Sequence, residues 1–224
     1  MMDRALELAP VNVDVIMGKI ETFLGEGDLA GARAFLRTAS KRVEPTELFP
    51  FVAGYNDVVW ILDREQAELL LTLTPSAFDG DLGAWGLGLA EACALNGDTA
   101  RTRVYAEEAR KANELAVRAT PDADSPHVGL GLSFAYLGRK EDAVREGLRA
   151  VSLHPVSKDE FFGPFNQHQL ARIYILVGEP EKALDQLEPL LKIPYNLSPG
   201  WLKIDPNFDP LRGNPRFQKL AAGA

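Results

Sequence analysis

Apolar residues recur at spacings of three and four along most of the chain, which is the period of one face of an α-helix. Two segments show this pattern clearly: Val13, Ile16, Ile20, Phe23 and Leu24, and later Leu170, Ile173, Tyr174 and Val177. The alternating apolar and polar pattern of a β-strand is weak throughout. The sequence therefore predicts an all-α protein.

Short breaks with helix-capping residues separate the predicted helices. Gly27-Asp28, Gly97-Asp98 and Gly178-Glu179-Pro180 each place a glycine beside an acid or a proline. Glycine favours the left-handed end of a helix, and an acid or proline favours the start of the next one. Because no Gly/Ser linker divides the chain, we expect a continuous series of antiparallel helix pairs.

A pattern of small and large residues repeats along these pairs. Its best copy contains Leu130, Gly131, Phe134, Gly138, Ala143, Ala150 and Pro155, and a second contains Leu170, Ala171, Tyr174, Gly178, Ala183 and Leu187. This pattern resembles the tetratricopeptide repeat, with partial copies near Phe23 and Leu89. The resemblance implies a right-handed α-solenoid, because stacking buries the apolar face that one pair leaves open. Gly147 stands where the repeat favours a large apolar residue, so looser packing is expected there.

The resemblance covers residues 1–195, as about five pairs plus a partial N-terminal helix. Residues 48–62 and 65–73 are interpreted as a degenerate pair without its turn glycine. A chain that begins within a repeat suggests the C-terminal part of a longer protein. It also leaves an uncapped N-terminal end, through which a homodimer could form.

Residues 196–224 form a different kind of segment, which we expect to cap the solenoid. Its Ile204-Asp205-Pro206, Asp209-Pro210-Leu211-Arg212 and Pro215-Arg216-Phe217 segments resemble the tails of tetratricopeptide regions in bacterial serine/threonine kinases, adenylate cyclases and winged-helix transcriptional regulators, although Lys203 stands where their pattern has leucine. Asn214-Pro215 predicts a final short helix. The residues expected to cover the last pair are Trp201, Leu202, Phe208, Leu211, Phe217 and Leu220.

Charge and composition narrow the classes of partner. Thirty-two acidic residues against 24 basic ones give a net charge of -8, and no basic run offers the phosphate contacts of a nucleic-acid binder. No apolar run reaches the length of a membrane span, and the start lacks the apolar core of a signal peptide. With the single cysteine Cys93 in an apolar helical stretch, these features favour a cytoplasmic protein without nucleic-acid or membrane partners.

Residues suited to catalysis do not converge in the sequence. His127, His154 and His168 have no second ligand at metal-binding spacing. The glycine pairs at 86/88 and 129/131 fall inside predicted helices, at the small-residue sites of the repeat, and no P-loop or Gly-x-Ser-x-Gly elbow is present. We therefore expect helix packing at these glycines, and no enzyme activity, metal or cofactor.

A protein- or peptide-interaction scaffold is the function that the resemblance implies, because tetratricopeptide repeats bind peptides along the first helix of each pair. In this register the candidate groove residues are Asn56, Trp60, Glu91, Tyr136, His168 and Arg172. Polar members of this set are costly to bury unpaired, which suits solvent or groove positions. The register offers no set of lysines for acidic peptide tails, so a mixed apolar and polar groove is favoured.

Two other functions stay open at the level of sequence. A small-molecule sensor would have an apolar pocket lined by Trp60, Trp85 or Tyr136. A self-association module would instead complete its uncapped N-terminal end with a neighbouring chain.

Overall fold

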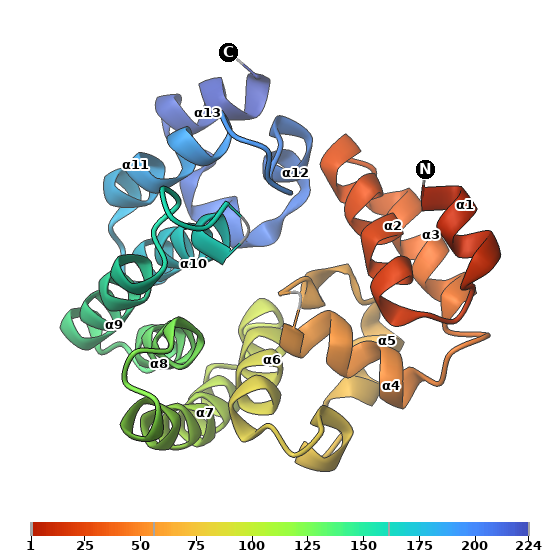
Figure 1. Ribbon diagram of the computed structural model, residues 1–224, viewed down its shortest axis with the longest axis horizontal. Helices are drawn as coiled ribbons and strands as arrows, with labels where there is room; N and C mark the ends of the chain where they lie inside the picture. Colours follow the sequence, from red (N-terminus) through yellow and green to blue (C-terminus); the bar gives the residue numbers. More distant parts are fainter. Residues whose placement is uncertain (1, 56, 161, 224) are drawn as a thin grey trace.

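The computed structural model describes residues 2–55, 57–160 and 162–223, which fold into helices without a β-strand (Figure 1). The α-helices are α1 (Met2–Leu8), α2 (Val13–Glu26), α3 (Leu29–Ala39), α4 (Pro45–Pro50), α5 (Arg64–Leu70), α6 (Leu82–Leu95), α7 (Thr99–Ala119), α8 (Asp124–Tyr136), α9 (Lys140–Leu153), α10 (Phe162–Leu176), α11 (Pro180–Leu190), α12 (Pro199–Ile204) and α13 (Pro215–Ala222). Shorter turns are η1 (Phe51–Tyr55), η2 (Val59–Ile61), η3 (Pro75–Phe78) and η4 (Pro206–Leu211). Consecutive pairs α2/α3, α6/α7, α8/α9 and α10/α11 pack side by side, which confirms the all-α solenoid.

The turn glycines act as predicted. Gly27, Gly97, Gly138 and Gly178 all have φ between 73° and 79°, a conformation that side chains with a Cβ rarely adopt. At the first of these turns, the Asp28 carboxylate then accepts a hydrogen bond of 2.8 Å from the Gly31 amide, which caps α3. Local chemistry thus reverses the chain direction at each pair.

Glycines inside the helices permit close crossings, as the repeat pattern predicted. A Cβ on Gly86 of α6 would lie 2.8 Å from the carbonyl oxygen of Tyr105 in α7. The looser packing expected at Gly147 is not found, because the Cδ1 atoms of Ile173 and Leu170 fill the space beside it. Helix α10 of the next pair therefore replaces the large side chain that α9 lacks.

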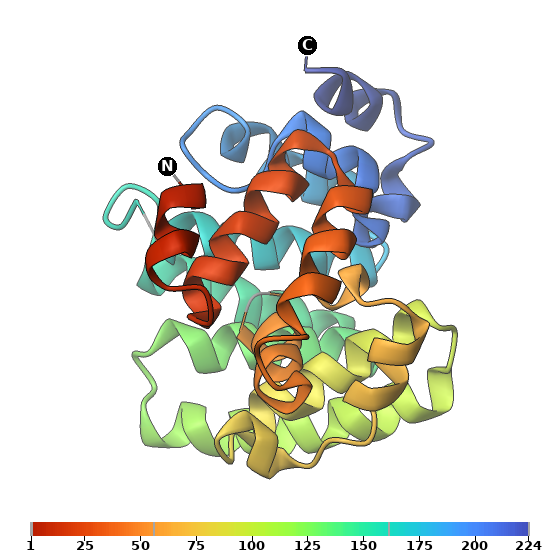
Figure 2. The ribbon, with the colours of Figure 1, turned by 90° about the vertical axis from the view of Figure 1, so that its right-hand side faces the viewer.

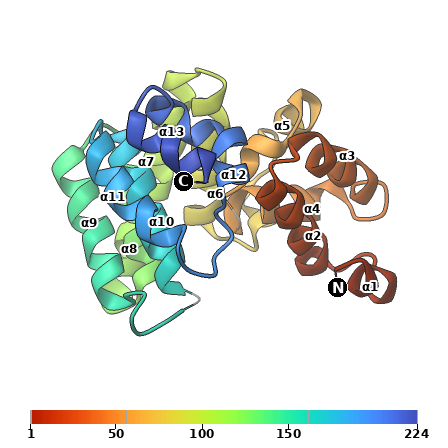
Figure 3. The ribbon, with the colours of Figure 1, turned by 90° about the horizontal axis from the view of Figure 1, so that it is seen from above.

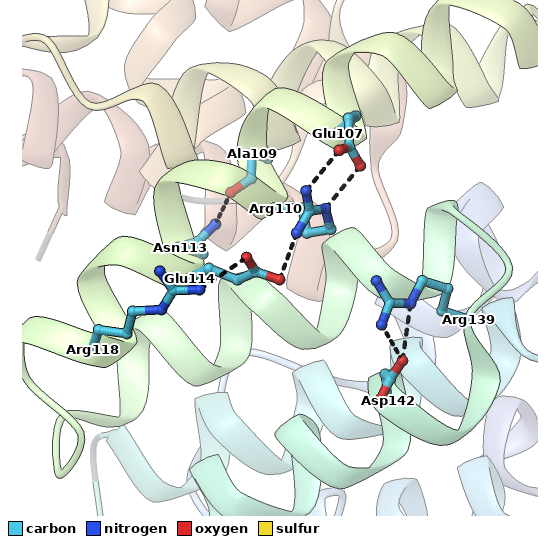
Figure 4. A network of polar contacts seen from close by, with 8 residues as sticks. All are labelled: Glu107, Ala109, Arg110, Asn113, Glu114, Arg118, Arg139 and Asp142. Carbon is cyan, nitrogen blue, oxygen red and sulfur yellow. Dashed lines mark hydrogen bonds and ion pairs between the residues drawn. The ribbon is translucent and has the colours of Figure 1, made fainter.

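A partly exposed face of α7 carries paired charges. Figure 4 shows Arg110 between Glu107 and Glu114. Its Nη2 lies 2.7 Å from Glu107 Oε1, and its Nη1 lies 2.5 Å from Glu114 Oε1. Asn113 turns the other way, donates to the Ala109 carbonyl oxygen at 2.9 Å, and fits against Gly83 and Gly129 of the neighbouring helices. The acid pairs of this helix thus belong to a solvated face, where ion pairs stabilise little.

The degenerate second pair is less regular than predicted. Residues 48–62 do not form one helix: α4 ends at Pro50, a π-helical turn follows in η1, and a 3-10 turn forms in η2. Pro50 has no N–H to continue the helical ladder, and Asp57 has a left-handed φ of 54°. This break brings Asp57 into the interior of the molecule.

The C-terminal tail packs against α10 and α11 of the last pair and also reaches the first pair. Trp201, Leu202, Phe208, Leu211 and Phe217 are buried as expected, and α13 begins where Asn214 caps it. In addition, α12 packs against α2 (Figures 1 and 2). The contact closes the helix pairs into a ring, with α1 at the outer edge against α2 (Figure 3).

The ring closure depends on backbone packing at a small seam, formed by Gly25, Gly27, Ser198 and Gly200. The Ser198 hydroxyl donates to the Gly25 carbonyl oxygen at 2.6 Å. A Cβ on Gly200 would lie 2.7 Å from that same oxygen. Beside this seam, Trp201 packs edge-on against Trp60, with ring centroids 6.2 Å apart.

Candidate functional site

Helix α10 presents a polar face to the interior of the ring. Phe165, His168, Gln169 and Arg172 follow the spacing of three and four that places residues on one helical face. The opposite face, including Leu170 and Ile173, packs into the apolar core. His168, Gln169 and Arg172 are all buried, so this helix carries polar side chains into the interior of the molecule.

A cavity of about 790 Å³ lies inside the ring. It is bounded by α2, Asp57, α10, the segment 194–197 and the tail. Its apolar lining consists of Met17, Phe51, Phe162, Phe165, Pro194, Leu197 and Trp201. Its acidic lining consists of Asp14, Glu21, Asp57, Asp124, Asp159, Glu160 and Asp205.

Arg172 ties four segments together at the floor of this cavity. Its guanidinium lies 2.8 Å from the Asp57 carboxylate and 2.9 Å from that of Glu91 on α6. Its Nη1 also donates to Gln169 Oε1 at 3.2 Å, while Asn207 of the tail donates to Glu91 at 3.0 Å. One buried cation therefore links α6, α10, the loop before η2 and the tail.

Burial and charge act against each other in this network. Burial raises the pKa of Glu91 to about 7, and the charge of Asp57 adds to the rise while Arg172 opposes it. Burial alone would lower the pKa of Arg172, but the two carboxylates hold it well above its usual value. Arg172 is therefore a permanent charge, and its acidic partners neutralise it.

Asp205 orients the tail beside the same network. Its carboxylate accepts from the Trp201 indole N–H at 3.0 Å and from the backbone N–H of Asn207 at 2.8 Å. Burial raises the pKa of Asp205 to about 6, although these hydrogen bonds favour the charged form. The carboxylate positions Asn207, which in turn contacts Glu91.

His168 and Gln169 leave buried nitrogen atoms without partners. His168 Nδ1 lies 3.2 Å from the Tyr195 hydroxyl, and its ring stacks on Phe208 with centroids 6.0 Å apart. Neither His168 Nε2 nor Gln169 Nε2 has a hydrogen-bond partner in the described part of the chain. Their residues are 8% and 1% exposed, and both line the cavity. Unpaired buried polar atoms cost roughly 1–3 kcal/mol each, so a ligand that pairs with them would gain affinity.

The pKa of His168 leads to a testable pH dependence. Burial, with the charge of Arg172, lowers this pKa to about 3, whereas an unfolded chain protonates the histidine near pH 6.5. Below that pH the unfolded state binds a proton that the folded state excludes, so His168 reduces stability as the pH falls. We expect the free energy of unfolding of the wild type, relative to that of His168→Gln, to fall by about 1 kcal/mol between pH 7.5 and pH 5.5. Urea unfolding at both pH values measures this, and an unchanged difference would contradict a neutral buried His168.

The structure brings together four of the residues proposed from the sequence. His168 and Arg172 line the cavity, Glu91 pairs with Arg172, and burial and the charge of Glu91 raise the pKa of the nearby Tyr136. Glu91, His168 and Arg172 were expected at solvent or groove positions; all three are buried, His168 and Arg172 line the cavity, and Glu91 forms an ion pair with Arg172. Trp60 is buried beneath Trp201 and does not line the cavity, and Asn56 lies outside the described residues.

Other cavity residues had no clear signal in the sequence. Asp57 and Asp205 enter through an irregular loop and the tail, and Glu21 comes from α2, across the ring from α10. Gln169 could have been noticed, because it precedes Arg172 by one helical turn and lies next to the candidate His168. The aromatic residues expected around a sensor pocket lie elsewhere: the Trp85 indole donates to the Leu73 carbonyl at 2.9 Å.

The described residues show neither a metal-binding cluster nor a membrane-spanning helix. Among them, no three His, Cys, Asp or Glu side chains are grouped closely enough to hold a metal ion. Within the same ranges, no helix combines the length and apolar character needed to cross a bilayer. Cys93 is buried, and burial raises the pKa of its thiol.

Comparison with known proteins gave a structural similarity but no family. No family model matches the chain, and no curated protein matches it. Among solved structures, this chain is similar to the Q17M variant of a putative kinesin light chain from Podospora anserina. That crystal structure shows nearly identical TPR-like repeats. That match has 18% sequence identity and a TM-score of 0.39, and covers 96% of this chain and 93% of the other.

Proposed function

We propose that this chain is a non-catalytic binding protein that holds a short peptide segment of a partner protein inside its ring. The observation that carries this proposal is that two side chains lining the cavity, His168 and Gln169, each have a nitrogen atom without a hydrogen-bond partner among the described residues. A peptide backbone offers both carbonyl oxygens and N–H groups, which are the partners that such atoms need. The stacked helix pairs supply a rigid frame for this site.

The Arg172 network supports a preformed site. Its ion pairs fix α6, α10 and the tail relative to one another before any ligand arrives. Apolar side chains such as Phe165 and Trp201 line the same cavity, so a ligand could bury apolar surface as well as form hydrogen bonds. A preformed site loses less entropy on binding than an open flexible groove.

Calorimetry on peptides selected from a random library tests this function. We expect Asn196→Trp, which places an indole on the cavity lining, to weaken binding by about tenfold or more. Lys192→Trp is the matched control, because Lys192 is exposed on the same segment but does not line the cavity. Failure to select any peptide, or equal affinity for the two variants, would contradict the proposal.

A small-molecule sensor is the second candidate, and the closure of the ring favours it. The cavity volume of about 790 Å³ falls within the range of roughly 300–1,000 Å³ typical of small-ligand sites. In that case library selection would fail, whereas a small-molecule screen would give saturable binding that Asn196→Trp abolishes.

The proposal extends to the cellular role of this chain. The tail resemblance, including Asp205-Pro206 and Asp209-Pro210, supports a scaffold in a bacterial signalling or regulatory protein of the cytoplasm. A kinase, cyclase or DNA-binding domain encoded in the same reading frame would support that context. Self-association is a separate candidate, and sedimentation at two concentrations would detect it.

A further inference from the structure

The cavity has an excess of negative charge that its own cation does not offset. Seven acidic side chains line it, whereas Arg172 is its sole Arg or Lys among the described lining residues, and His154 Nδ1 lies 3.0 Å from only one of the acids, Asp124. Arg172 is already engaged by Asp57, Glu91 and Gln169. Arg172 therefore cannot neutralise the other acidic side chains of the cavity.

Glu21 is the clearest case of an uncompensated acid. It lies on the cavity face of α2, seven residues after Asp14 and four after Met17, which both line the cavity. Its side chain is half-buried, and no ion pair or hydrogen bond joins it to another described residue. Burial raises the pKa of the Glu21 carboxyl, and no cation among the described residues offsets this rise through a hydrogen bond or an ion pair. A carboxylate in such a place is stabilised when a cation arrives.

Tyr195 connects this acidic region to the unpaired nitrogen atoms. Tyr195 lines the cavity together with Asp57 and Glu21, and burial and the charges of these two acids raise the pKa of its hydroxyl. The same hydroxyl lies 3.2 Å from His168 Nδ1, and the opposite nitrogen of that ring has no partner. The negative region and the unpaired polar groups thus belong to one site.

We propose that the peptide held in the ring is basic, and that Glu21 pairs with a lysine or arginine side chain of that peptide. This inference rests on the proposed peptide-binding function and specifies its ligand. The aromatic lining residues Phe51 and Trp201 suit the aliphatic stem and the cationic head of such a side chain. His168 and Gln169 then pair with the peptide backbone.

A double-mutant cycle on the selected peptides tests the pairing. The peptides should be enriched in lysine or arginine, and Glu21→Gln should weaken their binding by about tenfold in calorimetry. A peptide whose basic residue is replaced by norleucine should bind the wild type and Glu21→Gln equally. Glu26→Gln is the control, because Glu26 is exposed on the same helix and does not line the cavity.

The results of these titrations distinguish the preference for a basic peptide from peptide binding itself. The inference would be overturned if the selected peptides lacked basic residues, or if Glu21→Gln left their affinity unchanged. Peptide binding in the ring would still stand in either case, provided that Asn196→Trp blocked those peptides. If no peptide binds in the ring, both proposals fail.

Discussion

Replacing Arg172 by leucine is expected to destabilise the fold by about 3–5 kcal/mol, because it removes one partner from a buried ion pair. The loss would leave Glu91, 3% exposed, and Asp57 without the guanidinium that neutralises them. It would also leave the Gln169 amide oxygen without the donor Arg172 Nη1. Since small domains are stable by only about 5–15 kcal/mol, this change removes a large share of the total.

Chemical unfolding followed by circular dichroism measures the effect. Arg64→Leu is the matched control, since the Arg64–Glu68 pair is exposed on α5, and little change is expected. Adding Glu91→Gln and Asp57→Asn to Arg172→Leu should recover part of the lost stability, because the buried charges are then removed as well. A loss similar to that of Arg64→Leu would show that Arg172 does not hold the ring together.

Replacing Gly200 by valine is expected to open the ring. A Cβ at this position would lie 2.7 Å from the Gly25 carbonyl oxygen and 2.9 Å from the Gly27 nitrogen. Both are backbone atoms, so no side chain can rotate away to make room. Overpacking of this kind costs about 1–3 kcal/mol, and separation of α12 from α2 would relieve it.

Small-angle X-ray scattering and unfolding measurements together detect this opening. We expect a larger radius of gyration and lower stability for Gly200→Val. Gly213→Val is the control, because a Cβ on Gly213 meets no atom within 4 Å. Equal behaviour of the two variants would mean that the glycine seam does not close the ring.

The repeats could be predicted because their signals are local. The turn glycine Gly27 and the cap Asp28 are neighbours in the chain, and the small residues that permit helix crossing recur at fixed spacing. The ring closure has no such signal, since Ser198 bonds to Gly25 across 173 positions of sequence. Nothing in either segment alone indicates that the other will cover it.

The candidate site was predictable to a similar extent. Helix register placed Glu91, His168 and Arg172 on inner positions, because that face follows from a period of 3.6. Asp57 was missed, since it enters through the break after Pro50, where a longer helix was expected. The long-range pairing of Arg172 with Glu91 and Asp57 could not be read from the register, and it turns the expected groove residues Glu91 and Arg172 into parts of a buried ion-pair network.

The central claim is that a peptide binds inside the ring, and one calorimetric comparison tests it most directly. A library-selected peptide is titrated into the wild type, Asn196→Trp and Lys192→Trp. We expect one peptide per chain, affinity reduced by about tenfold or more in Asn196→Trp, and affinity within about twofold of the wild type in Lys192→Trp. Undiminished binding to Asn196→Trp would place the ligand outside the cavity and contradict the claim.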